Sequence, residues 1–546
     1  MHQISLFQQD QDKSISVSSA ATLLGVSTAT IRNWIKAGYL ESCVGGLTKA
    51  SLENVESTTV GIEKLVSRAN KGYGNADIDV DAIQHRFLES CRSEEDGAAL
   101  GVQYQESLPN SYRNKEGIYY TPKNIVDNLF DQIDVDYSKV TFCDPCCGSG
   151  NFLMSALERG VRPENIYGFD TDIVAVEICK SRVKSFTGID AGENVFNKDF
   201  LEYSAGVDAS KFDLMFTNPP WGKKIHKDIK ICYSQNFGCG KSLDTCALFF
   251  FSCLRSVEDD GYLGLLLPES FFNIAVFEEA RVKLLSMEVL SFLDYGKSFK
   301  GLVTRAQGVV LRNRFLNESN SETKCVYGDS VFSRDQKSFS TNPKSIVNFD
   351  KSEEEDRLIK GLYKREHVTL NGSAKWGLGI VTGNNKKHCF ETEKEGRIPV
   401  LKGADLSGGK FNPPTVFISP DLTKYQQVAP LEMYEAKEKI VYKFISSKLC
   451  FCFDDQQRFF LNSANMFVLD KGFPISAQEI CKLFSSDFMN WLYQSLFRTH
   501  KVLRSDLQAL PIHLGYFAKF EKFDEQHYLD YLEIERIENG SYRAKG

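Results

Sequence analysis

Asp144-Pro145-Cys146-Cys147-Gly148-Ser149-Gly150-Asn151-Phe152 sets the fold class of this 546-residue chain. An apolar segment, residues 140–143, comes directly before it and predicts a strand that ends at the acidic residue. A strand followed by a carboxylate, a glycine-rich turn and a helix forms a ligand crevice at the edge of a parallel sheet. The spacing is not G-x-G-x-x-G, and it is not a phosphate loop because no Gly-Lys-Ser/Thr follows.

The sequence on both sides of this turn shows the alternating pattern of an α/β domain. From about residue 104 to residue 313, short apolar runs rich in β-branched and aromatic residues alternate with amphipathic helical stretches. This alternation predicts an α/β fold, a Rossmann-like parallel sheet with helices on both faces. Cys146 and Cys147 are interpreted as small residues that pack tightly within the turn.

Two further carboxylates follow the next expected strands. Asp170 comes about twenty residues after the glycine-rich turn, the spacing at which a carboxylate accepts hydrogen bonds from ribose hydroxyls. Asp199 can accept from the amino group of an adenine, while the ring of Phe200 packs on the purine. Each aspartate alone could be a helix cap. In this order and at sheet spacing, they indicate a ligand that contains adenosine.

The segment Asn218-Pro219-Pro220-Trp221 follows the apolar run 212–217 and carries the chemistry. The prolines fix the backbone, so the Asn218 side-chain oxygen and the Pro219 carbonyl can both accept from one planar amino group. Holding both hydrogens moves that nitrogen toward tetrahedral geometry and frees its lone pair for attack on a sulfonium methyl group. Trp221 offers a face on which an extruded base can stack. A proline turn after a strand is the alternative interpretation.

These segments together resemble the gamma-class N6-adenine DNA methyltransferases of the TaqI type, in which a catalytic domain precedes a target recognition domain. Residues 117–122 match the first motif of that family, GxYYTP. The resemblance implies S-adenosylmethionine as cofactor, with Asn218, Pro219, Pro220 and Trp221 as catalytic residues. The cofactor-binding residues it implies are Tyr120, Thr121, Pro122, Asp144, Cys146, Gly148, Gly150, Phe152, Asp170, Asp199 and Phe200.

The resemblance and the local charge also suggest residues that contact DNA. Phe299 lies in a segment that resembles the family's second stacking aromatic, so Trp221 and Phe299 are expected to enclose the target base. Among the lysines that follow the catalytic motif, Lys223 and Lys224 are expected to brace the displaced strand. Lys386 and Lys387 are expected to contact phosphates. The alternatives are that Phe299 is a core residue and that any one of these lysines lies on a solvated face.

Residues 14–40 predict two short helices around a tight turn, and the segment resembles the winged helix-turn-helix of the MerR and excisionase type. Arg32 and Lys36 would then face a DNA groove. A helical hairpin that caps a larger domain is the alternative.

Composition changes along the chain predict five regions. These are an all-α helix-turn-helix domain (1–55), a helical connector (56–104), the methyltransferase domain (105–313), a polar linker (314–370) and a mixed α+β target recognition domain (371–546).

The net charge of −7 means that a DNA partner must be bound by local basic clusters. Fifteen cysteines include a single CxxC without a second pair at zinc spacing, so no metal is expected. The polar amino terminus and the absence of an apolar run of ~20 residues predict a cytoplasmic protein with no membrane partner.

The expected function is site-specific methylation of adenine N6 in double-stranded DNA by base flipping. The family suggests the modification component of a restriction-modification or related defence system, with a separately encoded restriction endonuclease as a partner. Methylation of RNA, of protein glutamine or of cytosine N4 stays open, since these also present planar amines. A helix-turn-helix regulator with an inactive methyltransferase domain is the alternative from another class.

Overall fold

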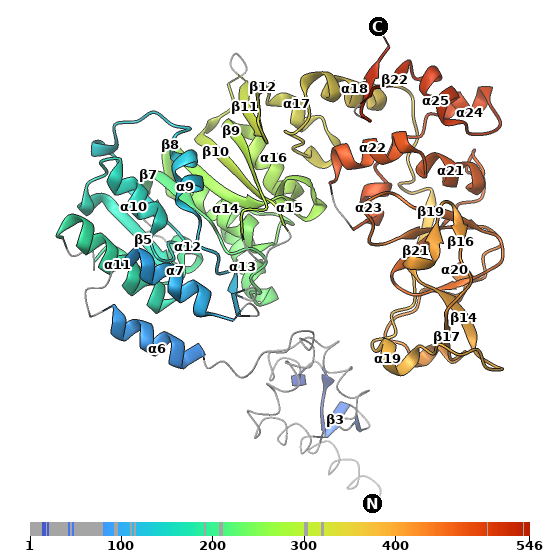
Figure 1. The fold of residues 1–546 in the computed structure, drawn as a ribbon, viewed down its shortest axis with the longest axis horizontal. Coiled ribbons are helices and arrows are strands. Elements are labelled where there is room, and N and C mark those ends of the chain that lie inside the picture. The colour runs from blue at the N-terminus through green and yellow to red at the C-terminus, as the bar shows by residue number, and fades with distance from the viewer. Residues whose placement is uncertain are drawn as a thin grey trace, which may run out of the picture. The chain divides into compact units, whose positions relative to one another are not determined.

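The computed structural model describes residues 14–17, 19–20, 42–43, 46–48, 80–91, 97–109, 112–113, 116–189, 193–206, 211–299, 304–317, 321–498, 501–538 and 540–545 (Figure 1). Contacts divide the chain into two compact units, Met1–Ile78 and Asp79–Gly546. A search of the described helices finds none that is long and apolar enough to cross a membrane.

The described part of the first unit contains a small antiparallel sheet of order β1-β3-β2, with β1 (Ser14–Ile15), β2 (Ser42–Cys43) and β3 (Gly46–Thr48). The expectation that this region is all-α is therefore wrong. Strands of two or three residues are too short to show an alternating pattern, so they leave no recognisable strand signal in the sequence. The predicted reading helix, with Arg32 and Lys36, lies outside the described residues.

The second unit is built on a nine-stranded mixed sheet of order β12-β11-β9-β10-β8-β7-β4-β5-β6. Its strands are β4 (Phe142–Asp144), β5 (Ile166–Asp170), β6 (Val195–Asn197), β7 (Phe212–Thr217), β8 (Val257–Pro268), β9 (Met287–Gly296), β10 (Ala306–Phe315), β11 (Glu322–Tyr327) and β12 (Ser330–Asp335).

The Rossmann-like α/β class is confirmed, although the sheet that was expected to be parallel also contains antiparallel strands. Strands β4 to β8 run parallel, whereas β10 is inserted antiparallel between β8 and β9, and β12 runs antiparallel to β11. A strand covered on both faces shows a continuous apolar run whichever way it points, so the sequence could not reveal the direction of β10. The chain leaves β4 toward β5 on one side and reaches β7 on the other, so a ligand crevice opens at the carboxyl end of β4.

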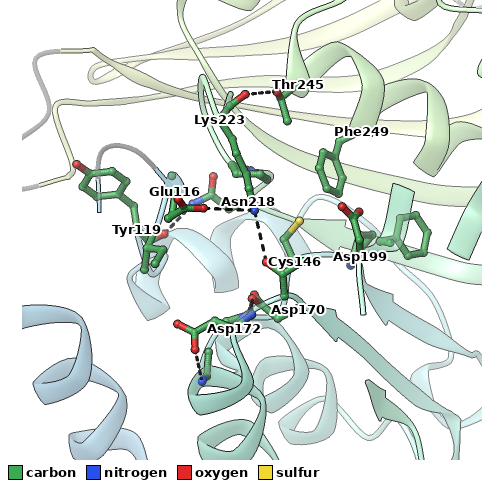
Figure 2. Close-up of a pocket in the computed structure, with 18 of the residues that line it drawn as sticks. Glu116, Tyr119, Cys146, Asp170, Asp172, Asp199, Asn218, Lys223, Thr245 and Phe249 are labelled. Atoms are coloured by element: carbon green, nitrogen blue, oxygen red, sulfur yellow. Dashed lines mark hydrogen bonds and ion pairs between the residues drawn. The ribbon is translucent and has the colours of Figure 1, made fainter. Parts of the chain in front are cut away.

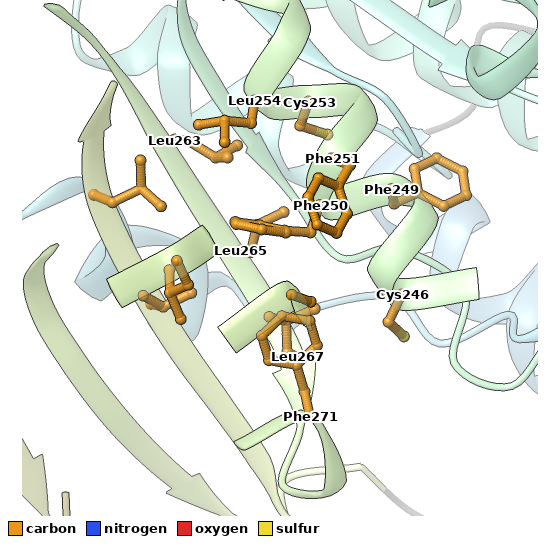
Figure 3. Packing of buried hydrophobic residues seen from close by; sticks show 14 of the residues in the cluster. Cys246, Phe249, Phe250, Phe251, Cys253, Leu254, Leu263, Leu265, Leu267 and Phe271 are labelled. Atoms are coloured by element: carbon orange, nitrogen blue, oxygen red, sulfur yellow. The ribbon is translucent and has the colours of Figure 1, made fainter. Parts of the chain in front are cut away.

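Helices cover both faces of this sheet, and alternate strand residues enter two separate cores. On one side, Leu265 and Leu267 of β8 pack against α14 (Thr245–Ser256), whose side chains are buried on nearly every side (Figure 3). On the other side, Leu266 packs with α9 (Lys123–Phe130), α10 (Asn151–Glu158) and α11 (Ile173–Thr187). The all-round apolar segment 246–254 is thus a buried core helix. Further helices of this part are α12 (Phe200–Ala205), α13 (Lys227–Phe237), α15 (Ser270–Asn273) and α16 (Glu278–Ser286).

Two of the expected domain boundaries differ from the structure. Helices α6 (Val80–Ser90) and α7 (Gly97–Ser107), expected as connector, pack on α11 through Phe87, Leu100 and Tyr104. The expected linker 314–370 contains β11 and β12 of the sheet. In β11 only Thr323 and Cys325 are fully buried while their neighbours face solvent, so the strand has the polar composition of a surface segment.

The carboxyl-terminal part combines small sheets with helices, and the mixed α+β prediction is confirmed. One sheet has the order β13-β21-β18-β19, another β17-β14-β20, and two are hairpins, β15-β16 and β22-β23. The strands are β13 (Ala374–Leu378), β14 (Ile398–Leu401), β15 (Leu406–Ser407), β16 (Lys410–Phe411), β17 (Val416–Ile418), β18 (Lys439–Lys443), β19 (Phe451–Asp454), β20 (Phe459–Phe460), β21 (Ala464–Leu469), β22 (Ile534–Arg536) and β23 (Tyr542–Ala544). The helices from residue 337 onward are α17 (Lys337–Ser340), α18 (Glu353–Lys364), α19 (Asn385–His388), α20 (Leu431–Tyr434), α21 (Ala477–Phe484), α22 (Asp487–Leu496), α23 (Arg504–Leu507), α24 (Leu514–Lys519) and α25 (Glu525–Tyr531).

Candidate active site

A cavity of about 400 Å³ opens at the carboxyl ends of β4, β5 and β7, where the fold places its crevice. This volume lies within the range of small-molecule sites. Ten of its lining residues carry labels in Figure 2. The predicted site residues that line it are Tyr120, Cys146, Gly148, Asp170, Asp199, Phe200, Asn218, Pro220 and Lys223.

The glycine-rich turn is held by close packing beneath the cavity. Asp144 is fully buried, and its Oδ1 accepts from the Cys146 amide at 3.0 Å, so it shapes the turn and does not line the cavity. Burial raises the pKa of Asp144 to about 7. A Cβ on Gly148 would lie 2.8 Å from the Tyr120 ring, and this glycine has a φ of +50°. The glycine therefore allows the GxYYTP segment to approach the turn.

Asp170 links the turn to the end of β5. Its two carboxylate oxygens accept from the backbone amides of Gly148 and Asp172, each at 2.9 Å. Burial raises the pKa of Asp170 to about 6. Asp199 lines the cavity and also caps α12, since its Oδ1 accepts from the Leu201 amide at 2.9 Å. Asp199 is thus a helix cap, as the alternative interpretation held, and it also lines the cavity.

Asn218 is held in one orientation by the segment 119–121. Its Nδ2 donates to the Tyr119 carbonyl at 3.0 Å and to Thr121 Oγ1 at 3.1 Å. A carbonyl oxygen can only accept, so the atom that faces it must be the amide nitrogen. The buried Oδ1 meets no donor among the described residues. The site therefore presents a fixed, desolvated acceptor beside the cavity.

Trp221 and Phe299 are brought together, but they do not form an open slot. Their ring centroids lie 5.4 Å apart with an interplanar angle of 81°, an edge-to-face contact. Phe299 is only 6% exposed and also contacts the Tyr119 ring. A base between two parallel rings needs about 7 Å, twice the usual contact distance of ~3.5 Å. The rings must separate before a base can lie between them.

The other predicted residues occupy different places. Thr121 and Phe152 line a small hollow that adjoins the cavity, while Pro122 and Gly150 act as N-caps of α9 and α10. Pro219 is buried next to Asn218 and does not line the cavity.

The four predicted lysines divide into two kinds. Lys223 turns inward, with its Nζ 3.7 Å from Glu116 Oε2 and 3.4 Å from Thr171 Oγ1 (Figure 2). In this structure Lys223 therefore contacts residues of the cavity wall, and its expected contact with a displaced DNA strand stays a prediction. Lys224 is exposed, and Lys386 and Lys387 are exposed on α19.

Several lining residues were missed by sequence reasoning. Gln84 and Tyr112 come from the segment expected as connector and its neighbourhood, and Glu116 precedes the GxYYTP motif by one position. Ile225 and Phe249 add apolar wall. Glu116 had a usable signal, its position beside the motif, whereas Gln84 of α6 and Phe249 of α14 reach the cavity through helix packing.

The lining fits a ligand with an adenosine part. It offers carboxylates at the ends of two adjacent strands, the Phe200 and Phe249 rings, and the backbone of a glycine-rich turn. Of the described residues, no three or more His, Cys, Asp or Glu side chains are grouped to hold a metal ion.

Comparison with known proteins identifies the family. Residues 100–291 match the N-6 DNA Methylase family, and residues 398–512 match the TaqI-like C-terminal specificity domain. The type II methyltransferase M.VspI of Vibrio sp. (strain 343) is 43% identical over 410 residues, which cover 74% of this chain and 99% of that protein. This chain belongs to the type II methyltransferases. The resemblance to a catalytic domain followed by a TaqI-like specificity domain is confirmed.

More distant relatives of this type II methyltransferase share part of its length. The modification methylase CviBIII of Paramecium bursaria Chlorella virus NC1A is 24% identical over 238 residues, covering 43% of this chain and 58% of that protein. The type IIL restriction-modification enzyme MmeI, solved in complex with DNA, has a TM-score of 0.51 at 11% identity over 75% of this chain and 70% of that chain. The DrdV–DNA complex gives a TM-score of 0.51 at 11% identity over 92% and 65%. These two structures share the fold.

Proposed function

We propose that this chain transfers a methyl group from S-adenosylmethionine to N6 of adenine at a specific site in double-stranded DNA. It would serve as the modification component of a restriction-modification or related defence system, with a separately encoded restriction endonuclease as partner. The observation that carries the proposal is the buried Asn218 Oδ1, an acceptor that meets no donor from the described part of the chain. A buried acceptor left without a donor costs about 1–3 kcal/mol, so its position calls for a ligand group that donates.

The amino group of a flipped adenine supplies such a donor. Asn218 Oδ1 accepts one of its hydrogens, and the Pro219 carbonyl accepts the other. Because the Asn218 amide is anchored on Tyr119 and Thr121, it cannot rotate to offer its nitrogen instead. Orientation of this kind contributes most of the rate in a reaction that needs no covalent enzyme intermediate.

S-adenosylmethionine, when bound, supplies an electrophilic methyl group on sulfur. In this proposal Asp170 holds the ribose hydroxyls, Asp199 and Phe200 hold the adenine ring, and the glycine-rich turn lies along the ligand. Tyr120 and its neighbours form the wall at the amino-acid end.

The specificity domain would bind the duplex, with Lys386 and Lys387 of α19 as exposed phosphate contacts and Lys224 near the catalytic motif. Extrusion of the adenine costs a few kcal/mol of stacking and pairing. Stacking on Trp221, once Phe299 has moved off its edge, offsets part of this cost. The first unit, expected as a helix-turn-helix, would add DNA grip or regulate the protein's own operon.

The test is expression in a bacterial host that lacks adenine methylation, followed by single-molecule sequencing of its genome. We expect N6-methyladenine at one sequence motif, and none from Asn218→Ala. N4-methylcytosine at the motif would reassign the base. A methyl-free genome from protein that binds S-adenosylmethionine would contradict the proposal and favour an RNA or protein-glutamine substrate.

A further inference from the structure

The catalytic part and the specificity domain are joined through a short buried segment, residues 344–350. Its side chains enter two different cores: Ile346 belongs to the core that contains residues of α21 and α22, whereas Val347 and Phe349 belong to the core of the catalytic sheet. The Val347 amide also donates to the Phe272 carbonyl at 3.0 Å. The placement of the specificity domain therefore depends on how this segment is held.

A buried arginine of the catalytic part holds the start of the segment. Arg281 of α16 is fully buried, and its Nη1 donates to the carbonyls of Phe271 and Ile274 at 2.8 and 2.7 Å. Its Nε and Nη2 donate to the carbonyls of Lys344 and Ser345 at distances between 2.9 and 3.3 Å. Lys344 and Ser345 have φ angles of +57° and +51°, a left-handed backbone that brings their carbonyls to the guanidinium. Arg281 thus fixes main-chain positions on both sides of it.

The side chain of Lys344 reaches the specificity domain. Its Nζ donates to the Ser505 carbonyl at 2.7 Å and lies 3.4 Å from Asp506 Oδ1, both in α23. The Asp506 side chain is only 3% exposed, so loss of the ammonium would leave a buried carboxylate without its counter-charge. Lys344 lies in neither of the segments that match known families, 100–291 and 398–512.

A second ion pair joins the same two parts. Arg498, which follows α22, pairs with the buried Asp350, and its guanidinium lies 4.7 Å from the centre of the Tyr327 ring of β11. Two points of attachment fix an orientation, whereas a single one would leave a hinge.

The catalytic side of this attachment leads to the candidate active site. Arg281 is bonded to Phe271 of α15, which directly follows β8. Near the end of β8, the Leu266 carbonyl accepts from Trp221 Nε1 at 3.3 Å. The strand end that positions Trp221 therefore continues into the helix that holds Arg281 and, through it, Lys344.

We infer that Lys344 is a positioning residue for methyl transfer. Held by Arg281 on one side and by α23 on the other, it sets the specificity domain at the angle that delivers the target base to Asn218. The inference rests on the proposed function. A misplacement of ~1 Å can lower a rate by about 100-fold, whereas contacts of the specificity domain with DNA do not need this angle. Rate and DNA affinity should therefore separate.

The experiment compares Lys344→Met with Lys439→Met in the full chain. Lys439 is the matched control, because it forms a buried ion pair with Asp454 at 2.7 Å and both partners lie in the specificity domain. The substrate is a duplex that carries the motif found by genome sequencing. We expect Lys344→Met to lower kcat by about 10- to 100-fold, with the KM for the duplex and the affinity for S-adenosylhomocysteine close to the wild-type values. Lys439→Met should lower the melting temperature and leave kcat unchanged.

Two further variants separate position from stability. Lys344→Arg keeps a cation beside Asp506 and should restore most of kcat. The double variant Lys344→Met/Asp506→Asn removes the lone buried carboxylate, so its melting temperature should recover while kcat stays low. Three outcomes would overturn the inference: a wild-type kcat in Lys344→Met, a kcat that recovers together with the melting temperature in the double variant, or an equal loss of kcat in Lys439→Met.

Hydrogen exchange of the unliganded chain keeps this inference apart from the proposed function. We expect the Val347 amide to exchange about tenfold faster, or more, in Lys344→Met than in the wild type, and at the wild-type rate in Lys439→Met. A wild type that methylates no duplex would remove the proposed function. Faster exchange at Val347 would then still support the attachment through Lys344, and unchanged exchange would overturn it.

Discussion

The side-chain nitrogen of Asn218 lies 3.0 Å from the main-chain carbonyl of Tyr119, across 99 positions of sequence. The same nitrogen donates to Thr121 Oγ1. Two independent acceptors fix the amide plane, so the orientation of the Asn218 side-chain oxygen depends on a segment that lies far away in the chain. In the proposed reaction, the GxYYTP segment therefore acts on the target amine through Asn218, as well as lining the cavity proposed for the cofactor.

Thr121→Val tests this relationship, because valine keeps the shape of a side chain that is only 4% exposed. Loss of one of the two hydrogen bonds should lower kcat by about three- to tenfold, since such a bond contributes ~0.5–1.5 kcal/mol. Calorimetry of cofactor binding separates this effect on kcat from the ligand contact that the family resemblance implies for Thr121. A weaker cofactor affinity with unchanged kcat would instead show that Thr121 acts on the ligand directly.

Trp221 can be tested by comparing Trp221→Phe with Trp221→Ala. The Trp221 Nε1 donates to the Leu266 carbonyl at 3.3 Å, so phenylalanine loses this bond but keeps a stacking face. We expect Trp221→Ala to weaken the extruded state by about 1–3 kcal/mol, the usual contribution of one base on an aromatic ring. The readout is the fluorescence of 2-aminopurine placed at the target position, which rises on extrusion. Equal signals from both variants would remove the stacking role.

Asp170 should make cofactor binding depend on pH. Burial raises its pKa to about 6 from an ordinary value of 3.8. In the proposed complex a ribose hydroxyl donates to the ionised Asp170 carboxylate, so cofactor affinity should fall as the pH drops from about 7 to about 5. The stability of the unliganded protein should depend on pH in the opposite direction. The native state keeps this proton at a pH where the unfolded chain has lost it, so stability decreases as the pH rises from about 4 to about 6.

Asp170→Asn is the control for that pH dependence. The difference between wild type and variant isolates this group from Asp144, whose pKa is also raised by burial. Calorimetric titrations at several pH values should show a flatter profile for the variant. Parallel profiles would mean that Asp170 does not change its ionisation on binding.

Two truncations test where the catalytic unit begins. A chain that starts at Asp79 keeps α6 and α7, whereas one that starts at residue 105 follows the boundary expected from composition. The second lacks Tyr104, whose hydroxyl donates to Asp172 Oδ2 at 2.7 Å, and exposes Val174 and Ile178 of α11. We expect the first to bind S-adenosylhomocysteine like the full chain. The second should be unstable, because it loses the packing of several buried side chains.

The same truncations examine the first unit. If the chain starting at Asp79 methylates the same motif with the same DNA affinity, the first unit has a regulatory role and does not contribute to DNA binding. Loss of DNA affinity with intact cofactor binding would assign it to DNA contact.

Sequence alone predicted the features that depend on a short stretch of neighbouring residues. The strand before Asp144, the turn with Gly148 and the strand before Asn218 each combine a short apolar run with residues of special backbone geometry. Such patterns extend over about ten residues, so they can be recognised without knowledge of the rest of the chain. Since the carboxyl ends of neighbouring strands meet, the common location of Asp170, Asp199 and Asn218 also followed from their order.

Tertiary structure decided the features that depend on distant packing. The direction of β10 and the place of β11 in the sheet come from pairing partners, which hydrophobic pattern does not encode. Lys223 and Lys224 look alike in sequence, and only the φ of Gly222 and the hydrogen bond from Thr245 turn the first into the cavity. The sequence determined which chemical groups stand at the strand ends. The fold decided which of them face one another, because that depends on contacts between residues tens to hundreds of positions apart.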